Sequence, residues 1–495
     1  MADQDLINRL IDIVGPEWVS EDPAVTIAYS RDMHAYIRFG WETRRPDIVV
    51  LPKNSSEVQN IIRVARGFKI PVIPYGSGLN IFGWTLPRCG GIIVDLARMN
   101  QIIEINEENA TATVEAGCPH FKLQSELLKR RMFIHQPGAC SSIYLGSHFT
   151  HGCCSKATAR LGHIERQIVG YEMVLPDGTM LRTGSLADCR AQKRIWPHGP
   201  GPDLGHIPRY AEGALGIVTQ VTIKCHPLDE NVWPFWVAFD DIDNTIKAYI
   251  ELLHAEVCTG SSLYAGFKYI GYFSDSPEVA YRQNKIHPEF MLILSLQGTK
   301  RRIKFEEKVV REIANKYGGR VITDQLPFYQ MFVDSHLNMT SSLYSEYTMR
   351  YFGYPGTVGA PGGMVWAPIY DVAEYWKRLT LLYMNDPVLG DPDESDFEVN
   401  RSMILYPSQS GHYTLIEAAI AGHPVDPRLI KEIAPRFAEK FVREITDMGL
   451  AIDAKYGWTR RGEIGTISSY SELASKIKTA FDPDDVMNRG VWSIF

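Results

Sequence analysis

The sequence has no uninterrupted apolar run of about 18 residues, the length that a membrane-spanning helix needs. Its first fifteen residues, MADQDLINRLIDIVG, also lack the basic, then apolar, then small-residue order of a secretory signal peptide. We therefore expect no membrane span and a cytoplasmic location.

Long runs of one charge are absent too. Lys and Arg number 51 against 58 Asp and Glu, which gives a net charge of −7. Binding to nucleic-acid phosphates requires concentrated positive charge, so nucleic acid is not expected as the main partner.

The eight cysteines show no paired spacing and no CxxC motif. This favours free thiols in a reducing compartment over disulfides. It also excludes a cysteine-bound iron–sulfur centre, so redox electrons would have to leave to oxygen or to a separate partner.

The chain has 495 residues, which is too many for a single compact core, so we expect two or three domains. Short strands and helices alternate up to about residue 230, and longer helices follow, at 242–256, 302–318 and 427–449. Runs typical of strands, FMLILSLQG and GHYTLIEAAIA, separate them. This mixture predicts an α+β fold, and we divide the chain at 1–228, 229–455 and 456–495.

A glycine-rich segment, Pro74 to Asn80, follows a predicted strand. Glycines permit positive φ angles, and consecutive backbone N–H groups can then point at an anion. The segment is not GxGxxG and no helix pattern follows it, which disfavours a Rossmann turn. A loop that holds a pyrophosphate and an ordinary glycine-rich turn both remain open. Two further small-residue segments, 137–147 and 212–219, are weak signals alone.

The order of these segments is more informative. PYGSGLN, GGIIVDL, TVEAG, QPGACSSIYLGS, YEMVLPDGTMLRTG and EGALGIVTQV occur in this succession. The succession resembles the FAD-binding domain shared by vanillyl-alcohol oxidase, the p-cresol methylhydroxylase flavoprotein, and D-lactate and glycolate dehydrogenases. Residues 196–219 are most similar to the first two, and the tail FDPDDVMNRGVW resembles the family's closing segment. The implied fold is a two-part FAD-binding domain of the p-cresol-methylhydroxylase type with an α+β cap.

The resemblance implies FAD as the cofactor and assigns its contacts residue by residue. By this resemblance, the FAD pyrophosphate is bound by Pro74, Tyr75, Gly76, Ser77, Gly78, Leu79 and Asn80. The flavin and its ribityl chain fall to Pro137, Gly138, Cys140, Ser141, Ser142, Gly146 and Ser147. Backbone pairing with the flavin's pyrimidine edge or the adenine falls to Gly216, Ile217 and Val218, and contacts from the tail fall to Asn488 and Arg489.

Departures from the family pattern affect the chemistry. The Asp that vanillyl-alcohol oxidase keeps beside its flavin falls on Gly138, and an upstream acid falls on His135. The two histidine attachment points for covalent FAD fall on Gly363 and Asn80, so we expect no histidyl link. Cys140 matches the attachment cysteine of the berberine-bridge branch, and a small buried thiol is the alternative.

Four residues are candidates for catalysis. His135 is a possible base because imidazole titrates near neutral pH, and a structural histidine is the alternative. Tyr347 and Arg350 lie in a tyrosine-rich stretch that suits a phenolate or carboxylate, or an aromatic helix of the core. Tyr456 falls near the family's substrate-binding Tyr–Arg pair.

The expected reaction is hydride transfer from a C–H bond of a small alcohol or phenolic substrate to flavin N5. Oxidation of a 2-hydroxy acid is the alternative, although the HGDGNxH-like metal motif of those relatives is absent. No metal is therefore expected. A further alternative, from a different functional class, is a non-catalytic flavoprotein subunit that relays electrons or scaffolds a complex. Oxygen or an electron-transfer protein would be the acceptor, and we expect a homo-oligomer.

Overall fold

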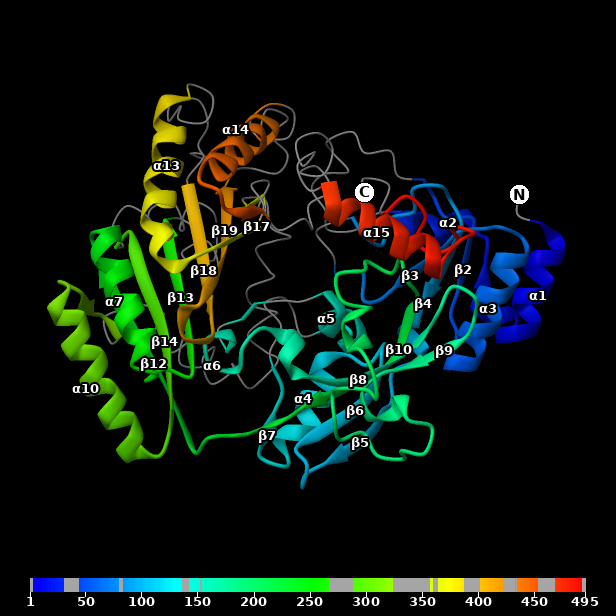
Figure 1. Cartoon of the computed structure of the whole chain (residues 1–495), viewed down its shortest axis with the longest axis horizontal. Coiled ribbons are helices and arrows are strands. Elements are labelled where there is room, and N and C mark those ends of the chain that lie inside the picture. The colour runs from blue at the N-terminus through cyan, green and yellow to red at the C-terminus, as the bar shows by residue number, and fades with distance from the viewer. Residues whose placement is uncertain are drawn as a thin grey trace.

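The computed structural model describes most of the chain. The described residues are 3–30, 44–79, 83–135, 142–151, 154–155, 157–266, 288–323, 357–358, 364–386, 401–421, 432, 434–452 and 468–491. They form two lobes, which stand side by side in Figure 1. The first lobe is built from residues 3–227 and 468–491, and the second from residues 231–452.

The first lobe contains a small sheet with strand order β1-β2-β4-β3, in which β2, β4 and β3 run parallel. Its strands are β1 (Val19–Ser20), β2 (Ile48–Val50), β3 (Val72–Tyr75) and β4 (Ile92–Asp95). Helices α1 (Gln4–Val14) and α3 (Ser55–Gly67) cover one face, and α2 (Pro23–Thr26) lies nearby. The Asn54 side chain accepts the N–H of Glu57 at 2.9 Å, so the predicted helix start is confirmed.

A second, antiparallel sheet of the first lobe has the order β5-β6-β10-β8-β9. Its strands are β5 (Ile102–Asn106), β6 (Thr111–Glu115), β8 (Ile168–Val174), β9 (Met180–Arg182) and β10 (Ile217–Lys224). Strands β7 (Met132–Phe133) and β11 (His226–Pro227) form a separate pair. The helices here are α4 (His120–Leu128), α5 (Leu145–His151), α6 (Thr158–Leu161) and α15 (Ser468–Phe481).

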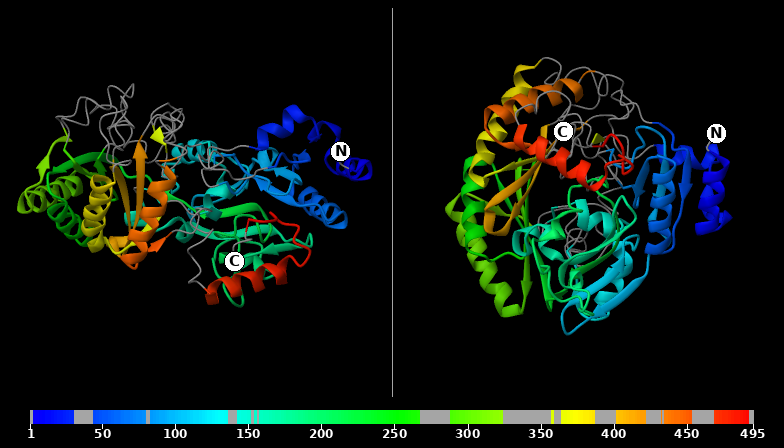
Figure 2. Two further views of the ribbon diagram at one scale, coloured as in Figure 1. Left: turned by 90° about the horizontal axis from the view of Figure 1, so that it is seen from above. Right: turned by 45° about the vertical axis from the view of Figure 1, so that its right-hand side comes forward.

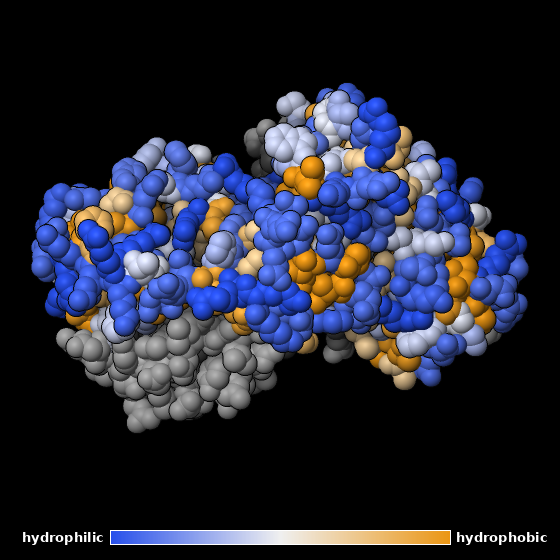
Figure 3. Space-filling model, turned by 90° about the horizontal axis from the view of Figure 1, so that it is seen from below, coloured by the Kyte–Doolittle hydropathy of each residue, from blue (hydrophilic) through white to orange (hydrophobic). Residues whose placement is uncertain are grey.

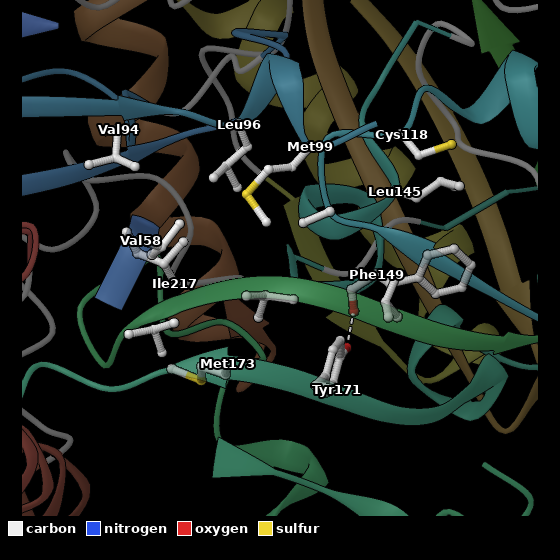
Figure 4. Packing of buried hydrophobic residues seen from close by; sticks show 14 of the residues in the cluster. Val58, Val94, Leu96, Met99, Cys118, Leu145, Phe149, Tyr171, Met173 and Ile217 are labelled. Atoms are coloured by element: carbon white, nitrogen blue, oxygen red, sulfur yellow. Dashed lines mark hydrogen bonds between the residues drawn. The ribbon is translucent and has the colours of Figure 1, made fainter. Parts of the chain in front are cut away.

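The two sheets of the first lobe share one apolar core, shown in part in Figure 4. Val58 of α3, Val94 of β4 and Ile217 of β10 all pack into it. The Tyr171 hydroxyl is also buried there and donates to the Phe149 carbonyl at 2.7 Å. This bond satisfies a polar atom that would otherwise weaken the core, and it fixes α5 against β8.

The second lobe is one mixed-length sheet with the order β15-β12-β14-β13-β18-β19-β17-β20, and β16 also pairs with β19. The strands are β12 (Asn231–Phe239), β13 (Gly260–Gly266), β14 (Phe290–Gly298), β15 (Arg320–Val321), β16 (Thr357–Val358), β17 (Met364–Ala367), β18 (Arg401–Ser408), β19 (Tyr413–Ala421) and β20 (Ala451–Ile452). The helices are α7 (Ile242–His254), α10 (Lys300–Lys316), α13 (Val372–Asn385) and α14 (Ala434–Asp447).

These four helices cover one face of the second sheet, here called its outer face (Figures 1 and 2). Alternate strand residues, such as Leu263, Leu405 and Ile416, point into the core beneath them. The neighbouring residues in each strand therefore occupy the inner face. The predicted α+β fold is confirmed, as are the helices near 242–256 and 302–318. Helix α14 (Ala434–Asp447) lies within the helix predicted at 427–449, and most of residues 427–433 lie outside the described residues.

The surface seen from below in Figure 3 is mainly hydrophilic, with separate hydrophobic patches. Among the described residues, no helix combines the length and apolar character needed to cross a membrane. Five of the cysteines that the structure describes are free thiols, in agreement with the sequence analysis. They are Cys89, Cys118, Cys189, Cys225 and Cys258.

Candidate cofactor and substrate site

The glycine-rich loop lies at the carboxyl end of β3, the end of a parallel sheet where ligands commonly bind. Gly78 has φ +69°, in the left-handed region that favours glycine. Within the described part of the chain, no carbonyl or side chain accepts the backbone N–H groups of Gly76, Ser77, Gly78 or Leu79. Four consecutive unsatisfied donors in a half-buried loop suit an anionic group such as a pyrophosphate.

Two other predicted segments approach this loop closely. A Cβ atom on Gly76 would lie 3.1 Å from the Ser147 hydroxyl of α5, and one on Gly213 would lie 2.8 Å from Pro74. Gly146 packs so tightly on Ala116 that a Cβ there would come within 2.5 Å of the Ala116 Cβ. The fold thus brings segments 74–79, 142–147 and 212–218 close together, and their contacts with FAD remain predictions.

The C-terminal segment closes the same region. The Val72 N–H donates to the Val486 carbonyl and the Asn488 N–H to the Val72 carbonyl, both at 2.8 Å. The Asn488 side-chain amide donates to the carbonyls of Trp84 and Glu212 at 2.9 and 2.6 Å. Asn488 is therefore buried, and its hydrogen bonds connect the C-terminal segment to β3, Trp84 and Glu212.

Lys478 of α15 makes further hydrogen bonds between this C-terminal segment and the rest of the lobe. Its ammonium donates to the carbonyls of Ala214 and Met487 and pairs with Asp482. Arg489 lies farther out, where its guanidinium donates to the carbonyls of Asp485 and Lys69.

Gly216, Ile217 and Val218 lie at the start of β10. Gly216 has φ +142°, and a Cβ there would be 2.3 Å from the Val174 carbonyl oxygen. Ile217 and Val218 pair with β8, and both side chains are buried. Only their backbone groups, rather than their side chains, are available to a cofactor.

His135 is completely buried at the end of the segment that follows β7. Its Nε2 lies 3.5 Å from the Thr158 hydroxyl of α6, and its carbonyl accepts a bond from His148 Nε2 at 3.4 Å. His120 stands edge-on to His148, with ring centroids 6.1 Å apart. Burial lowers the pKa of His120 to about 3 and that of His148 well below its usual value. These two neighbours of His135 are therefore neutral imidazoles.

The sequence analysis missed a polar group at the contact between the lobes. His163 pairs through Nδ1 with Glu165, and its Nε2 lies 3.4 Å from the Tyr210 hydroxyl. Its ring stands edge-on to Trp366 of β17, with centroids 5.6 Å apart. The sequence spacing of His163 and Glu165 is a weak signal, and Tyr210 is 47 residues away, so only the fold reveals the group.

Arg209 borders this group and is also largely buried. Its Nη2 lies 3.5 Å from a Glu165 oxygen, and Nη1 has no hydrogen-bond partner within the described residues. Burial lowers the pKa of Arg209, against the opposing effect of nearby Tyr171 and Tyr210. Tyr210 itself has φ +55°, an unusual conformation for a bulky residue and one that often marks functional sites.

The inner face of the second sheet continues from Trp366. Tyr406 pairs with Leu415, which pairs with Trp366, so the three lie in one row across the sheet. Tyr413 stands edge-on to Trp366, and Glu417 lies two residues beyond Leu415 on the same face. Tyr406, Tyr413, Glu417 and Trp366 are each partly exposed, whereas the other described side chains of β17, β18 and β19 are buried.

Several predicted site residues lie outside the described residues. They are the catalytic candidates Tyr347, Arg350 and Tyr456, the cofactor candidates Asn80, Pro137, Gly138, Cys140 and Ser141, and Gly363. Their assignments remain predictions.

Comparison with known proteins identifies the domain that contains the glycine-rich loop. Residues 46–184 match the FAD binding domain family. The glycolate oxidase subunit GlcD of Bacillus subtilis is 28% identical over 258 residues, which make up 52% of this chain and 52% of that protein. The chain thus matches about half the length of that relative.

Two solved structures share the fold over almost the whole chain. The 4-ethylphenol oxidase from Gulosibacter chungangensis has a TM-score of 0.82 at 16% identity, covering 99% of this chain and 97% of that one. The p-cresol methylhydroxylase with substrate bound has a TM-score of 0.78 at 18% identity, covering 99% and 96%. Residues 46–184 therefore form an FAD-binding domain with FAD as its cofactor, and the whole chain shares its fold with these two enzymes.

Proposed function

We propose that this chain is an FAD-dependent oxidoreductase that removes a hydride from a C–H bond of a small alcohol or phenolic substrate. The backbone N–H groups of Gly76 to Leu79, which have no acceptor among the described residues, are the observation that carries the cofactor assignment. Bound FAD would supply the hydride acceptor at flavin N5. Residues 1–228 with the C-terminal segment 456–495 would bind FAD, and residues 229–455 would form the cap over the substrate.

The inner face of the cap sheet supports an aromatic substrate. Trp366, Tyr406 and Tyr413 present rings at the contact between the lobes, and such surfaces suit flat apolar molecules. On this face, the described residues of β13, β17, β18 and β19 include no Lys or Arg. A 2-hydroxy acid would need such a cation for its carboxylate, unless Arg209 of the first lobe supplies it.

His163 is the better placed of the two histidines that could take the substrate's hydroxyl proton. Glu165 pairs with His163 Nδ1, which orients the ring and stabilises its charged form. Tyr210, beside Nε2, could pass the proton to it from the partly exposed side. His135 remains the alternative, but its Nε2 is close to Thr158 and it lies among neutral buried histidines.

The 2-hydroxy-acid alternative rests on the similarity to the glycolate oxidase subunit and on the unpartnered Nη1 of Arg209. A flavoprotein that only relays electrons or scaffolds a complex is the other alternative. Oxygen or an electron-transfer protein would reoxidise the flavin.

Anaerobic spectroscopy tests these functions directly. The purified protein is expected to be yellow with one FAD per chain, and a colourless protein that takes up no added FAD would contradict the proposal. Vanillyl alcohol, 4-ethylphenol, glycolate and D-lactate are then added separately. Bleaching of the flavin by the alcohol or phenol supports the proposed function, bleaching only by the acids supports the alternative, and no bleaching favours a relay or scaffold subunit.

A further inference from the structure

Three phenols and one carboxylate form a cluster beneath the glycine-rich loop. Asp95, the last residue of β4, pairs in register with Tyr75, the last residue of β3. Tyr29, which follows α2, donates its hydroxyl proton to Asp95 Oδ2 at 2.8 Å. The Tyr29 and Tyr75 rings stand edge to face, with centroids 4.8 Å apart. Tyr144, just before α5, is close enough for the Asp95 charge to add to burial in raising its pKa.

The Asp95 carboxylate depends on Tyr29. Asp95 is only 7% exposed, and its other oxygen accepts the Ala97 N–H at 2.8 Å. Within the described residues, no Lys, Arg or His pairs with it. A buried carboxylate without a cation is costly unless its oxygens are hydrogen-bonded, so the Tyr29 hydroxyl is an important partner.

The cluster reaches the loop through Tyr75. A Cβ built on Gly78 would lie 2.2 Å from the Tyr75 hydroxyl oxygen, so this phenol lies directly against the loop backbone. Tyr29 supports the Tyr75 ring from the side, and Asp95 holds Tyr29 in place. A chain of contacts thus runs from the N-terminal residues 3–30 to the backbone N–H groups of the loop.

We propose that Tyr29 and Asp95 form a clamp that positions the Pro74–Leu79 loop for FAD binding. Residues 3–30 then belong to the cofactor site, although the family match begins only at residue 46. Tyr29 and Asp95 are positioning residues, because they act through Tyr75 and need not touch FAD. The proposal rests on the assignment of this loop to FAD and is independent of the substrate.

The test measures FAD loading of apoprotein made under riboflavin depletion. Tyr29→Phe removes only the hydroxyl and keeps the ring contact with Tyr75. We expect it to raise the FAD concentration for half-maximal loading about tenfold, because it removes one hydrogen bond to a carboxylate. Tyr370→Phe removes the same atom from a 69% exposed tyrosine of the second lobe and should leave loading unchanged. Asp95→Asn should weaken loading in the same direction.

Thermal unfolding of the apo and FAD-loaded forms separates positioning from general stability. A clamp predicts that Tyr29→Phe lowers the Tm of the loaded protein more than that of the apoprotein, because the stabilisation from a bound ligand grows with the logarithm of its affinity. Equal losses of Tm in both forms with unchanged half-maximal loading would overturn the proposal. If Gly78→Val also loads FAD normally, the loop assignment itself is wrong; if only Tyr29→Phe and Asp95→Asn load normally, the clamp alone is wrong.

Discussion

His163 of the first lobe and Trp366 of the second meet edge to face, with ring planes at 72° and centroids 5.6 Å apart. This contact joins the Glu165–His163–Tyr210 group to the aromatic inner face of the cap sheet. In the proposed reaction, a substrate between the lobes would therefore meet an oriented imidazole on one side and aromatic rings on the other. The first prediction follows from this arrangement.

His163→Gln and Tyr210→Phe should each slow anaerobic flavin reduction about 100-fold, the usual lower range for loss of a general base or its relay. Stopped-flow absorbance with the alcohol or phenol that bleaches the wild-type flavin measures this rate, and FAD content checks folding. His135→Gln serves as the matched comparison. If His135→Gln slows reduction 100-fold while His163→Gln has wild-type rates, His135 is the base and our assignment is wrong.

Gly78→Val should abolish stable FAD binding. Its Cβ would lie 2.2 Å from the Tyr75 hydroxyl, and φ +69° is unfavourable for a β-branched residue. The ratio of flavin to protein absorbance in the purified variant measures the loss. Gly67→Val is the matched control, because nothing lies within 4 Å of a Cβ at Gly67. Unchanged FAD occupancy in Gly78→Val would remove PYGSGLN from the site.

Stability should fall as the pH drops from about 7 to 5, owing to the buried histidines. An unfolded imidazole takes up a proton near pH 6.5, whereas burial lowers the pKa of His120 to about 3. Below pH 6.5 the unfolded state binds more protons, so stability is full above that pH and is lost as the pH falls toward 3. His120 alone contributes a loss of about 2 kcal/mol at pH 5, and His148 acts in the same direction.

Chemical denaturation of the protein at pH 7 and pH 5 measures this dependence. His120→Gln should reduce the loss between the two pH values by about 2 kcal/mol, because glutamine does not titrate. His254→Gln, at an exposed position, should leave the loss as in the wild type. An unchanged pH dependence in His120→Gln would show that His120 is not a neutral buried group.

FAD should be bound without a histidyl link, because the two attachment positions of the family are Gly363 and Asn80. Precipitation with trichloroacetic acid should therefore leave the flavin in the supernatant. A yellow pellet would point to Cys140, and Cys140→Ala should then release the flavin. A yellow pellet from Cys140→Ala would show that the attachment lies elsewhere.

The local elements of this fold could be predicted because their signals lie within a few residues. The side chain of Asn54 caps α3 through Glu57, and the periodic apolar residues of α1 and α3 fill one core. The order of the glycine-containing segments also indicates FAD. Each segment needs glycine at particular positions for its backbone conformation or close packing, so the pattern is visible in the sequence. Positive φ at Gly78 and close packing at Gly76 and Gly213 are such requirements.

The partners of the polar side chains were decided only by the tertiary structure. Tyr29 and Asp95 are 66 residues apart, and His163 meets Trp366 from another lobe. No local pattern specifies such pairs, because they depend on how sheets and lobes pack after the elements form. The sequence by itself determined the elements, the cofactor class and the glycine loop. The packing of β3 against β4, and of the cap sheet against α6 and its following turn, decided which histidine, tyrosines and carboxylates surround the site.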